Sequence, residues 1–311
     1  MRVTTNSFPN RLIDQLGALA ARQARLQNQA ATGQRIALPE DDPRAMRRVL
    51  DMQNEAKTLD QFASNIGQIK EATTASYSSM RSLKKLSDRA SEIALLADGL
   101  KPQSTLNIYA SEINQILEEA VQTANTRHRG DYLFAGTRTD QPPFVLEKNA
   151  DGLITGVTYG GNADPIVAEI SPGVLSEGQP VGGNSNGTGP RGLISDSRSG
   201  ADFFNHLIQL RDNLTAGNVA AIADTDRSAL QRDEENFLYH YGHIGAIDSR
   251  LEAASGLAKE HSFAIEQQVS GLVDADLAQT LVRLNEVQNA YTAALQTGGS
   301  VLGQSLLDFL R

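Results

Sequence analysis

The sequence predicts a mainly α-helical protein with a small β insert, in which both termini form a long antiparallel helical bundle or coiled coil. Two observations support this fold class. Near both ends of the chain, apolar residues recur every 3.5 positions, which is the spacing of a helix that packs lengthwise on another helix. Between positions 136 and 200 lie thirteen of the 26 Gly and six of the ten Pro. We therefore expect long helices around a β-rich outer domain.

Leucine carries most of the 3.5-residue repeat at the two ends of the chain. Because the two repeats lie far apart in sequence, we expect the terminal helices to pair with each other or with neighbouring copies. Such pairing is typical of a subunit of an assembly and not of an enzyme active site. The predicted packing residues are Leu12, Leu16, Leu19, Leu26, Leu277, Leu281, Leu284, Tyr291, Leu295, Leu302, Leu306 and Phe309.

The first helix is expected from about Asn10 to Thr32. Gly33 follows and is expected to end it, because glycine accepts the left-handed conformation common at helix ends. The acidic segment that comes next predicts a turn. Asp42 is placed to cap a second helix, with Pro43 at its first position.

Two long helices follow in the first half of the chain. No Pro occurs from 44 to 101, so an apolar periodicity can continue unbroken from 43 to 97. Asp98 and Gly99 are expected to break it, and Pro102 follows the break. The next helix is predicted to bury a stripe of residues from Leu106 to Ala124.

The middle of the chain predicts short strands at 144–146, 153–159 and 166–170, each bounded by Gly, Pro or Asn. The glycine-rich run 182–189 is interpreted as a mobile loop tip. Helix is expected to resume near Asp202 and to continue to the C-terminus, with a break around 216–218.

Composition excludes several classes of function. The chain of 311 residues has no Cys and no Trp, which excludes disulfides and thiolate chemistry. Its net charge of −9 disfavours nucleic acid as a partner. Residues 1–50 are locally basic, which fits either a solvated helix face or an interface with an acidic neighbour. There is neither a membrane-spanning run nor the apolar core of a secretory signal peptide, so we expect a cytoplasmic protein or one exported without a cleaved signal.

The sequence contains no convincing pattern for catalysis or for a cofactor. His240 and His243, with Glu234 and Glu235 nearby, lack the spacing of a helical zinc motif and are interpreted as a solvated helix face. The acidic run 40–42 lacks the ligand spacing of a calcium loop, and 182–189 is not followed by the Lys and Ser or Thr of a phosphate loop. The tripeptide 129–131, Arg-Gly-Asp, is interpreted as a connection from helix to strand. We expect no enzyme, no metal and no cofactor.

Two motifs carry a resemblance to a known family. The first lies directly after the first helix and comprises Gly33, Arg35, Ile36, Asp41, Asp42 and Pro43. It resembles the flagellin superfamily, and Pro43 after the Asp pair is similar to the hook-associated protein 3 branch, the hook–filament junction proteins. The second motif comprises Gly130, Tyr132, Leu133, Phe134 and Gly136. This motif and the tail 305–310 resemble that branch as well.

The resemblance implies a secreted, extracellular structural subunit of the bacterial flagellum. It implies export of the unfolded chain through the flagellar type III apparatus, after a cytoplasmic chaperone has bound the C-terminal region. The expected partners are copies of the chain in a ring, the other hook-associated junction protein and flagellin. Flagellin itself, the bulk filament subunit, remains an alternative. A surface adhesin that uses residues 129–131 is another.

The distribution of Gly and Pro and the helical repeats give an expected division into domains, and the resemblance implies that the terminal domain is disordered in the monomer. Residues 1–40 with 270–311 are expected to form a terminal coiled-coil domain that is disordered in the monomer. Residues 41–130 with 201–269 are expected to form a helical rod. The β-rich outer domain is expected at 131–200.

Overall fold

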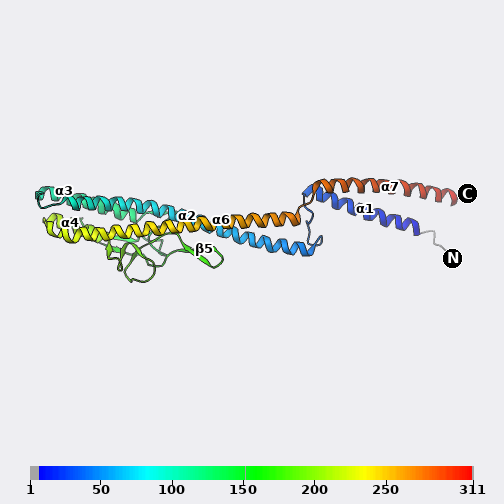
Figure 1. Ribbon diagram of the computed structural model, residues 1–311. Helices are drawn as coiled ribbons and strands as arrows, with labels where there is room; N and C mark the ends of the chain where they lie inside the picture. Colours follow the sequence, from blue (N-terminus) through cyan, green and yellow to red (C-terminus); the bar gives the residue numbers. More distant parts are fainter. Residues whose placement is uncertain (1–6, 151, 310–311) are drawn as a thin grey trace. The chain divides into compact units, whose positions relative to one another are not determined.

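The computed structural model describes the backbone of residues 7–150 and 152–309, and the side chains of residues 10–150 and 152–300. Helices make up most of it, and short strands lie in the middle of the sequence (Figure 1), which confirms the predicted fold class. The chain forms two compact units, which are described separately. The first comprises residues 1–58 and 261–311, and the second comprises residues 59–260.

In the first unit, α1 (Ser7–Thr32) and α7 (Leu277–Phe309) lie side by side (Figure 1). α1 ends as predicted, because Gly33 adopts a φ of 72° and its N–H donates to the Gln29 carbonyl at 2.9 Å. The prediction of an unbroken helix to the C-terminus was wrong. A break at 274–276 separates α6 from α7, and Asp276 caps α7 by accepting a hydrogen bond from the Gln279 N–H at 3.0 Å.

The predicted long helices of the first half are confirmed. They are α2 (Pro43–Leu96) and α3 (Gln103–Ala124), with the break at 97–102 between them. In the second half, α4 (Phe203–Ala216) ends at Gly217, whose φ is 69°. The short α5 (Val219–Ala221) and a π-helical turn, η1 (Ile222–Asp226), lead into α6 (Arg227–Val273). Among the described residues, none of the helices combines the length and the apolar character that a membrane span requires.

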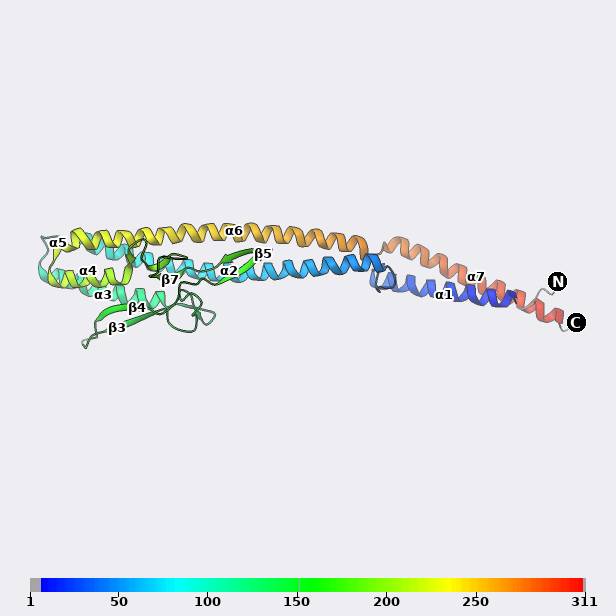
Figure 2. The ribbon, with the colours of Figure 1, turned by 90° about the horizontal axis from the view of Figure 1, so that it is seen from below.

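Short strands form four small sheets in the second unit, and Figure 2 shows strands of three of them beside the helices. Three sheets are antiparallel hairpins: β1 with β2, β3 with β4, and β5 with β6. In the fourth sheet, β8 pairs in parallel with β7 and antiparallel with β9. The strands are β1 (Arg127–His128), β2 (Asp131–Tyr132), β3 (Phe144–Lys148), β4 (Ile154–Tyr159), β5 (Val167–Ser171), β6 (Val174–Glu177), β7 (Val181–Asn184), β8 (Gly192–Asp196) and β9 (Ala201–Asp202).

The three strands expected from the sequence correspond to β3, β4 and β5, and the other six were missed. Two interpretations need correction. Residues 129–130 form the turn of the β1–β2 hairpin and not a plain connection from helix to strand, with positive φ at Arg129 and Gly130. Residues 182–184 are not part of a loop tip but lie buried in β7.

The β7 strand is buried because two glycines let its backbone approach an aromatic cluster. A Cβ atom on Gly182 would lie 2.7 Å from the Phe134 carbonyl oxygen and 2.8 Å from the Tyr159 ring. The loop after β7 is held by Asn184, whose side-chain amide donates to the carbonyls of Thr188 and Pro190, each at 2.6 Å. Glycine and asparagine therefore build a packed strand end here, where their abundance suggested mobility.

The main core of the second unit joins the β insert to the helices. Phe144 of β3 meets Phe204 of α4 edge to face, with ring centroids 5.1 Å apart. Phe203 meets Phe237 of α6 in the same way at 5.3 Å. A smaller cluster attaches β5 to α2 and α6 through Ile170, which packs among isoleucine and leucine side chains of both helices.

Candidate assembly interface

The α1 side of the terminal helix pair buries the residues that the sequence repeat singles out. Leu26 is fully buried, and Leu12, Leu16 and Leu19 are half-buried. The polar Gln23 lies at the same half-buried seam. The spacing of these positions alternates between three and four residues, so α1 presents one stripe to its partner.

The α7 side of the pair uses a seam that the sequence repeat only partly identifies. Leu284 and Tyr291 are half-buried in it. Thr280 and Val287 are buried, with exposed fractions of 6% and 5%. Sequence reasoning missed these two, and it also missed Gly298, where an added Cβ would collide with the Leu12 side chain. Thr280 is polar and Gly298 has no side chain, so a repeat defined by large apolar residues does not include them.

A second stripe on α7 remains exposed. Leu277, Leu281 and Leu295 have exposed fractions of 49%, 51% and 48%. Leu281 and Leu295 are two heptads apart and lie one position after the seam residues Thr280 and Ala294, along one flank of the seam. α7 thus carries one stripe that packs on α1 and a second, leucine-rich stripe that stays half exposed within the described part of the chain. The side chains of Leu302, Leu306 and Phe309 lie outside the described residues.

The first family motif forms the joint at which α1 and α6 end. The Arg35 N–H donates to the Val273 carbonyl, and the Arg35 Nη2 donates to the Leu272 carbonyl, both at 2.6 Å. The Ala275 N–H donates to the Gly33 carbonyl at 2.8 Å. Ile36 is buried beside this joint. The motif therefore joins the end of α1 to the end of α6, mainly through backbone hydrogen bonds. These bonds require a defined conformation of the loop after Gly33.

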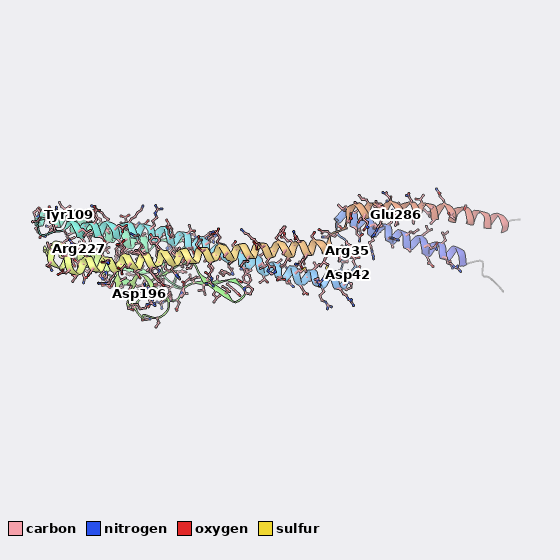
Figure 3. All side chains as sticks on the ribbon, viewed as in Figure 1. Arg35, Asp42, Tyr109, Asp196, Arg227 and Glu286 are labelled. Atoms are coloured by element: carbon pink, nitrogen blue, oxygen red, sulfur yellow. The ribbon has the colours of Figure 1, made fainter. Side chains whose placement is uncertain are left out.

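Two aspartates fix the turn that leads into α2 (Figure 3 labels Arg35 and Asp42). The Asp41 carboxylate accepts hydrogen bonds from the Leu38 and Ala37 N–H groups at 3.0 and 3.2 Å, and these bonds lower the pKa of Asp41. The Asp42 carboxylate accepts from the Ala45 N–H at 3.0 Å, which confirms the predicted cap. Their role is therefore to shape the backbone.

The second family motif holds strands of the β insert together within the second unit. Leu133 and Phe134 are buried, and the Phe134 carbonyl accepts hydrogen bonds from the Gly182 N–H at 2.8 Å and from the Tyr159 hydroxyl at 2.9 Å. Burial raises the pKa of Tyr159 to about 12. Tyr132 stacks under the guanidinium of Arg127, which lies 4.3 Å from the ring centroid.

The glycines of this motif take backbone conformations that other residues rarely adopt. Gly130 has a φ of 101° in the β1–β2 turn, and Gly136 has a φ of 65°. A Cβ on Gly136 would collide with Asn162, whose backbone N–H donates to the Ala135 carbonyl at 3.1 Å. Gly136 is thus required by its φ and by a close contact, and Gly130 by its φ alone.

The histidine pair does not form the solvated face expected from the sequence. His240 is 2% exposed, and its Nε2 lies 3.2 Å from the Gly192 carbonyl oxygen. His243 is half-buried, and its Nε2 lies 2.5 Å from a Glu177 carboxylate oxygen. Both face the β insert, which the periodicity of a single helix could not reveal. Across the described residues, no three His, Cys, Asp or Glu side chains gather in a way that could hold a metal ion.

Comparison with known proteins bears on this arrangement of terminal helices around a β insert. Residues 3–139 match the model of the bacterial flagellin N-terminal helical region. The chain is 23% identical to flagellar hook-associated protein 3 of Escherichia coli K12, over 89% of this chain and 90% of that protein. It is 22% identical to flagellar hook-associated protein 3 of Salmonella typhimurium LT2, over the full length of both. Over residues 3–139 this chain is therefore similar to the bacterial flagellins.

A solved structure from Vibrio parahaemolyticus, of a protein described as flagellar hook-associated, has the same fold. Its TM-score is 0.64, with 20% identity over 75% of this chain and all of that one. At this level of identity the likeness supports the fold. The flagellin model ends shortly after the second motif, so both family motifs lie within the matched region.

Proposed function

We propose that this chain is the structural subunit of the bacterial flagellum that joins the hook to the filament. The observation that carries the proposal is the exposed leucine stripe of α7, which lies beside a seam already filled by α1. A helix pair with a second apolar stripe is suited to pack against a third helix. Matches to hook-associated protein 3 of two bacteria, over 89% and 100% of this chain, support the junction over the bulk filament.

In this proposal the terminal helices pack axially, first within a subunit and then between subunits. The seam joins α1 to α7, while Leu277, Leu281 and Leu295 contact the helices of neighbouring copies. Leu302, Leu306 and Phe309 extend the same packing toward the C-terminus. Residues 1–40 with 270–311 act as the packing domain, 41–130 with 201–269 as a rod, and 131–200 as the outer domain.

The other partners follow from the position of a junction. The ring contacts the other hook-associated junction protein on one side and flagellin on the other. The chain reaches this place outside the cell through the flagellar type III apparatus, after a cytoplasmic chaperone has bound it. It needs no catalytic group, and none of the side chains described above has a geometry that suggests one.

The rival interpretations have less support. The flagellin family model also matches this chain, which would fit flagellin itself. However, the two relatives that match over most of the chain are both hook-associated proteins. An adhesin would have to present residues 129–131 freely. Arg129 lies 3.2 Å from the Glu71 carboxylate, residues 129–130 form a tight turn, and Asp131 begins β2. This geometry gives no reason to favour adhesion.

Deletion of the gene tests the proposal directly. Electron microscopy of the deletion strain, with a blot of its culture medium for flagellin, distinguishes the possibilities. We expect bare hooks together with flagellin lost to the medium. Bare hooks without any filament protein in the medium would identify the chain as flagellin, and normal filaments would contradict both.

A further inference from the structure

One face of α6 attaches the fourth sheet through polar side chains at helical spacing. The Asp233 carboxylate accepts from the Asp202 N–H at 2.9 Å. The Asn236 amide donates to the Gly192 and Leu193 carbonyls, each at 2.8 Å. His240 follows one turn later and contacts Gly192. Each of these contacts joins α6 to β8 or β9, so the sheet depends on this polar stripe.

The geometry fixes the protonation state of His240. A carbonyl can only accept a hydrogen bond, so the Nε2 that faces the Gly192 oxygen carries the proton. The other ring nitrogen, Nδ1, is buried and has no hydrogen-bond partner. In the neutral ring Nδ1 is a bare acceptor. Protonation would turn Nδ1 into a buried N–H donor without an acceptor. It would also leave the positive charge of the imidazolium ring unpaired.

The charged groups around His240 do not offset that charge at mildly acid pH. Arg191 and His243 both disfavour the imidazolium. Asp196, at the end of β8, favours it, but that carboxylate already binds Arg198 and the Gly192 N–H. Tyr239 meets the imidazole edge to face at 5.3 Å. Burial is the main reason that the pKa of His240 falls from 6.5 to about 4.

We propose that His240 is an acid-sensitive fastener, which holds the sheet of β7, β8 and β9 on α6 while it is neutral and releases the sheet when it is protonated. Opening the sheet exposes the imidazole to water, where it binds a proton with its ordinary pKa. Acid therefore favours the open form. The inference concerns the second unit alone and does not depend on the proposed function.

The sign and the size of the effect follow from linkage. A histidine with a lowered pKa in the closed state contributes stability that is fully present above pH 6.5 and is lost as the pH falls toward 4. From these two pKa values, the opening equilibrium should rise about 30-fold between pH 7.5 and pH 5. The contribution of His243 to stability depends on pH in the opposite direction, because its contact with Glu177 raises the pKa of His243. Its pairing with Glu177 is fully present below pH 6.5 and weakens as the pH rises.

Hydrogen exchange followed by mass spectrometry tests the fastener in the whole chain. Protection of peptides from 181–202 is measured at pH 7.5 and pH 5, corrected for the intrinsic exchange rates, with α3 peptides as the internal reference. We expect the wild type to lose about 30-fold protection in 181–202 and little in α3. The variant His240→Gln keeps a donor for Gly192 but does not titrate, so its loss should be several-fold smaller.

A control variant sharpens the test. His261→Gln, which removes an exposed histidine, should match the wild type. Equal losses in wild type and His240→Gln would overturn the proposal, and so would equal losses in 181–202 and α3. If His240→Gln does not fold, NMR titration of the wild-type imidazoles decides. The His240 resonance must titrate below about pH 5, and a midpoint near 6.5 would refute the fastener.

Discussion

Single residues determine how closely the β insert packs. Gly182 lets β7 lie against Phe134 and Tyr159, and Tyr159 in turn donates its hydroxyl proton to the carbonyls of Phe134 and Asn162, both at 2.9 Å. The second family motif thus contacts the Tyr159 hydroxyl of β4 and Gly182 of β7. These contacts constrain the residues of the motif, although β4 and β7 are remote from it in sequence.

Replacement of Gly182 by alanine should destabilise the second unit. The new Cβ would lie within 2.8 Å of three different residues, and overpacking of this kind costs about 1–3 kcal/mol. Urea unfolding followed by far-UV circular dichroism measures the loss. Gly245→Ala on α6 is the matched control, because no atom lies within 4 Å of its Cβ position and alanine favours helix by about 0.5–1 kcal/mol. Equal stability of both variants would contradict the packing described for β7.

Local chemistry was predictable at this scale, and remote contacts were not. The cap by Asp42 and the helix end at Gly33 follow from side-chain and backbone properties within four residues, and both are confirmed. The burial of His240 depends on Gly192, 48 positions away. The same holds for Gly182, whose neighbours come from β4 and from the second motif. No local pattern encodes such contacts.

At the scale of elements, α7 shows why a repeat alone cannot select a seam. The positions 277, 281, 284, 288, 291 and 295 alternate in steps of four and three, and so do 280, 284, 287, 291, 294 and 298. Both sets satisfy the 3.5-residue rule. The leucines favour the first set, but the second set is the one that α1 covers, through Thr280, Val287 and Gly298. The helices themselves were predictable because Pro is absent from them beyond the first turn.

The exposed stripe leads to a prediction about the ends of the monomer. A lone pair of helices with one filled seam leaves Leu281 and Leu295 in water, and isolated helices are marginal. We expect trypsin to cleave a dilute monomer rapidly after Arg22, Arg25 and Arg283, as detected by mass spectrometry. Arg211 is the internal control, because its guanidinium is buried and bonded to Asn114 and Ile154. Full resistance of both ends would contradict late folding of these helices.

At the scale of the molecule, charge is divided unevenly along the chain. Residues 59–260 contain 17 Lys and Arg against 26 Asp and Glu, so the whole net charge of −9 lies in the second unit. Residues 1–58 and 261–311 together are neutral. Subunits brought together by their terminal helices therefore also bring acidic units near one another, and these units repel.

Salt should accordingly strengthen self-association. The Debye length falls from about 30 Å at 0.01 M to about 10 Å at 0.1 M ionic strength, which screens the repulsion between acidic units but leaves apolar packing intact. Sedimentation velocity at fixed protein concentration measures the shift. An association that weakens with salt would mean that attraction between opposite charges, and not leucine packing, holds the copies together.

In the proposed assembly, the exposed flank of α7 contacts neighbouring subunits in the flagellum. The most direct test is electron microscopy of the deletion strain complemented with the double variant Leu281→Asp and Leu295→Asp. The control is Ala290→Asp with Thr297→Asp, which places the same charges on the exposed opposite flank of α7. We predict that the leucine variant is secreted but leaves bare hooks and flagellin in the medium, while the control builds filaments. Normal filaments on the leucine variant would contradict the account.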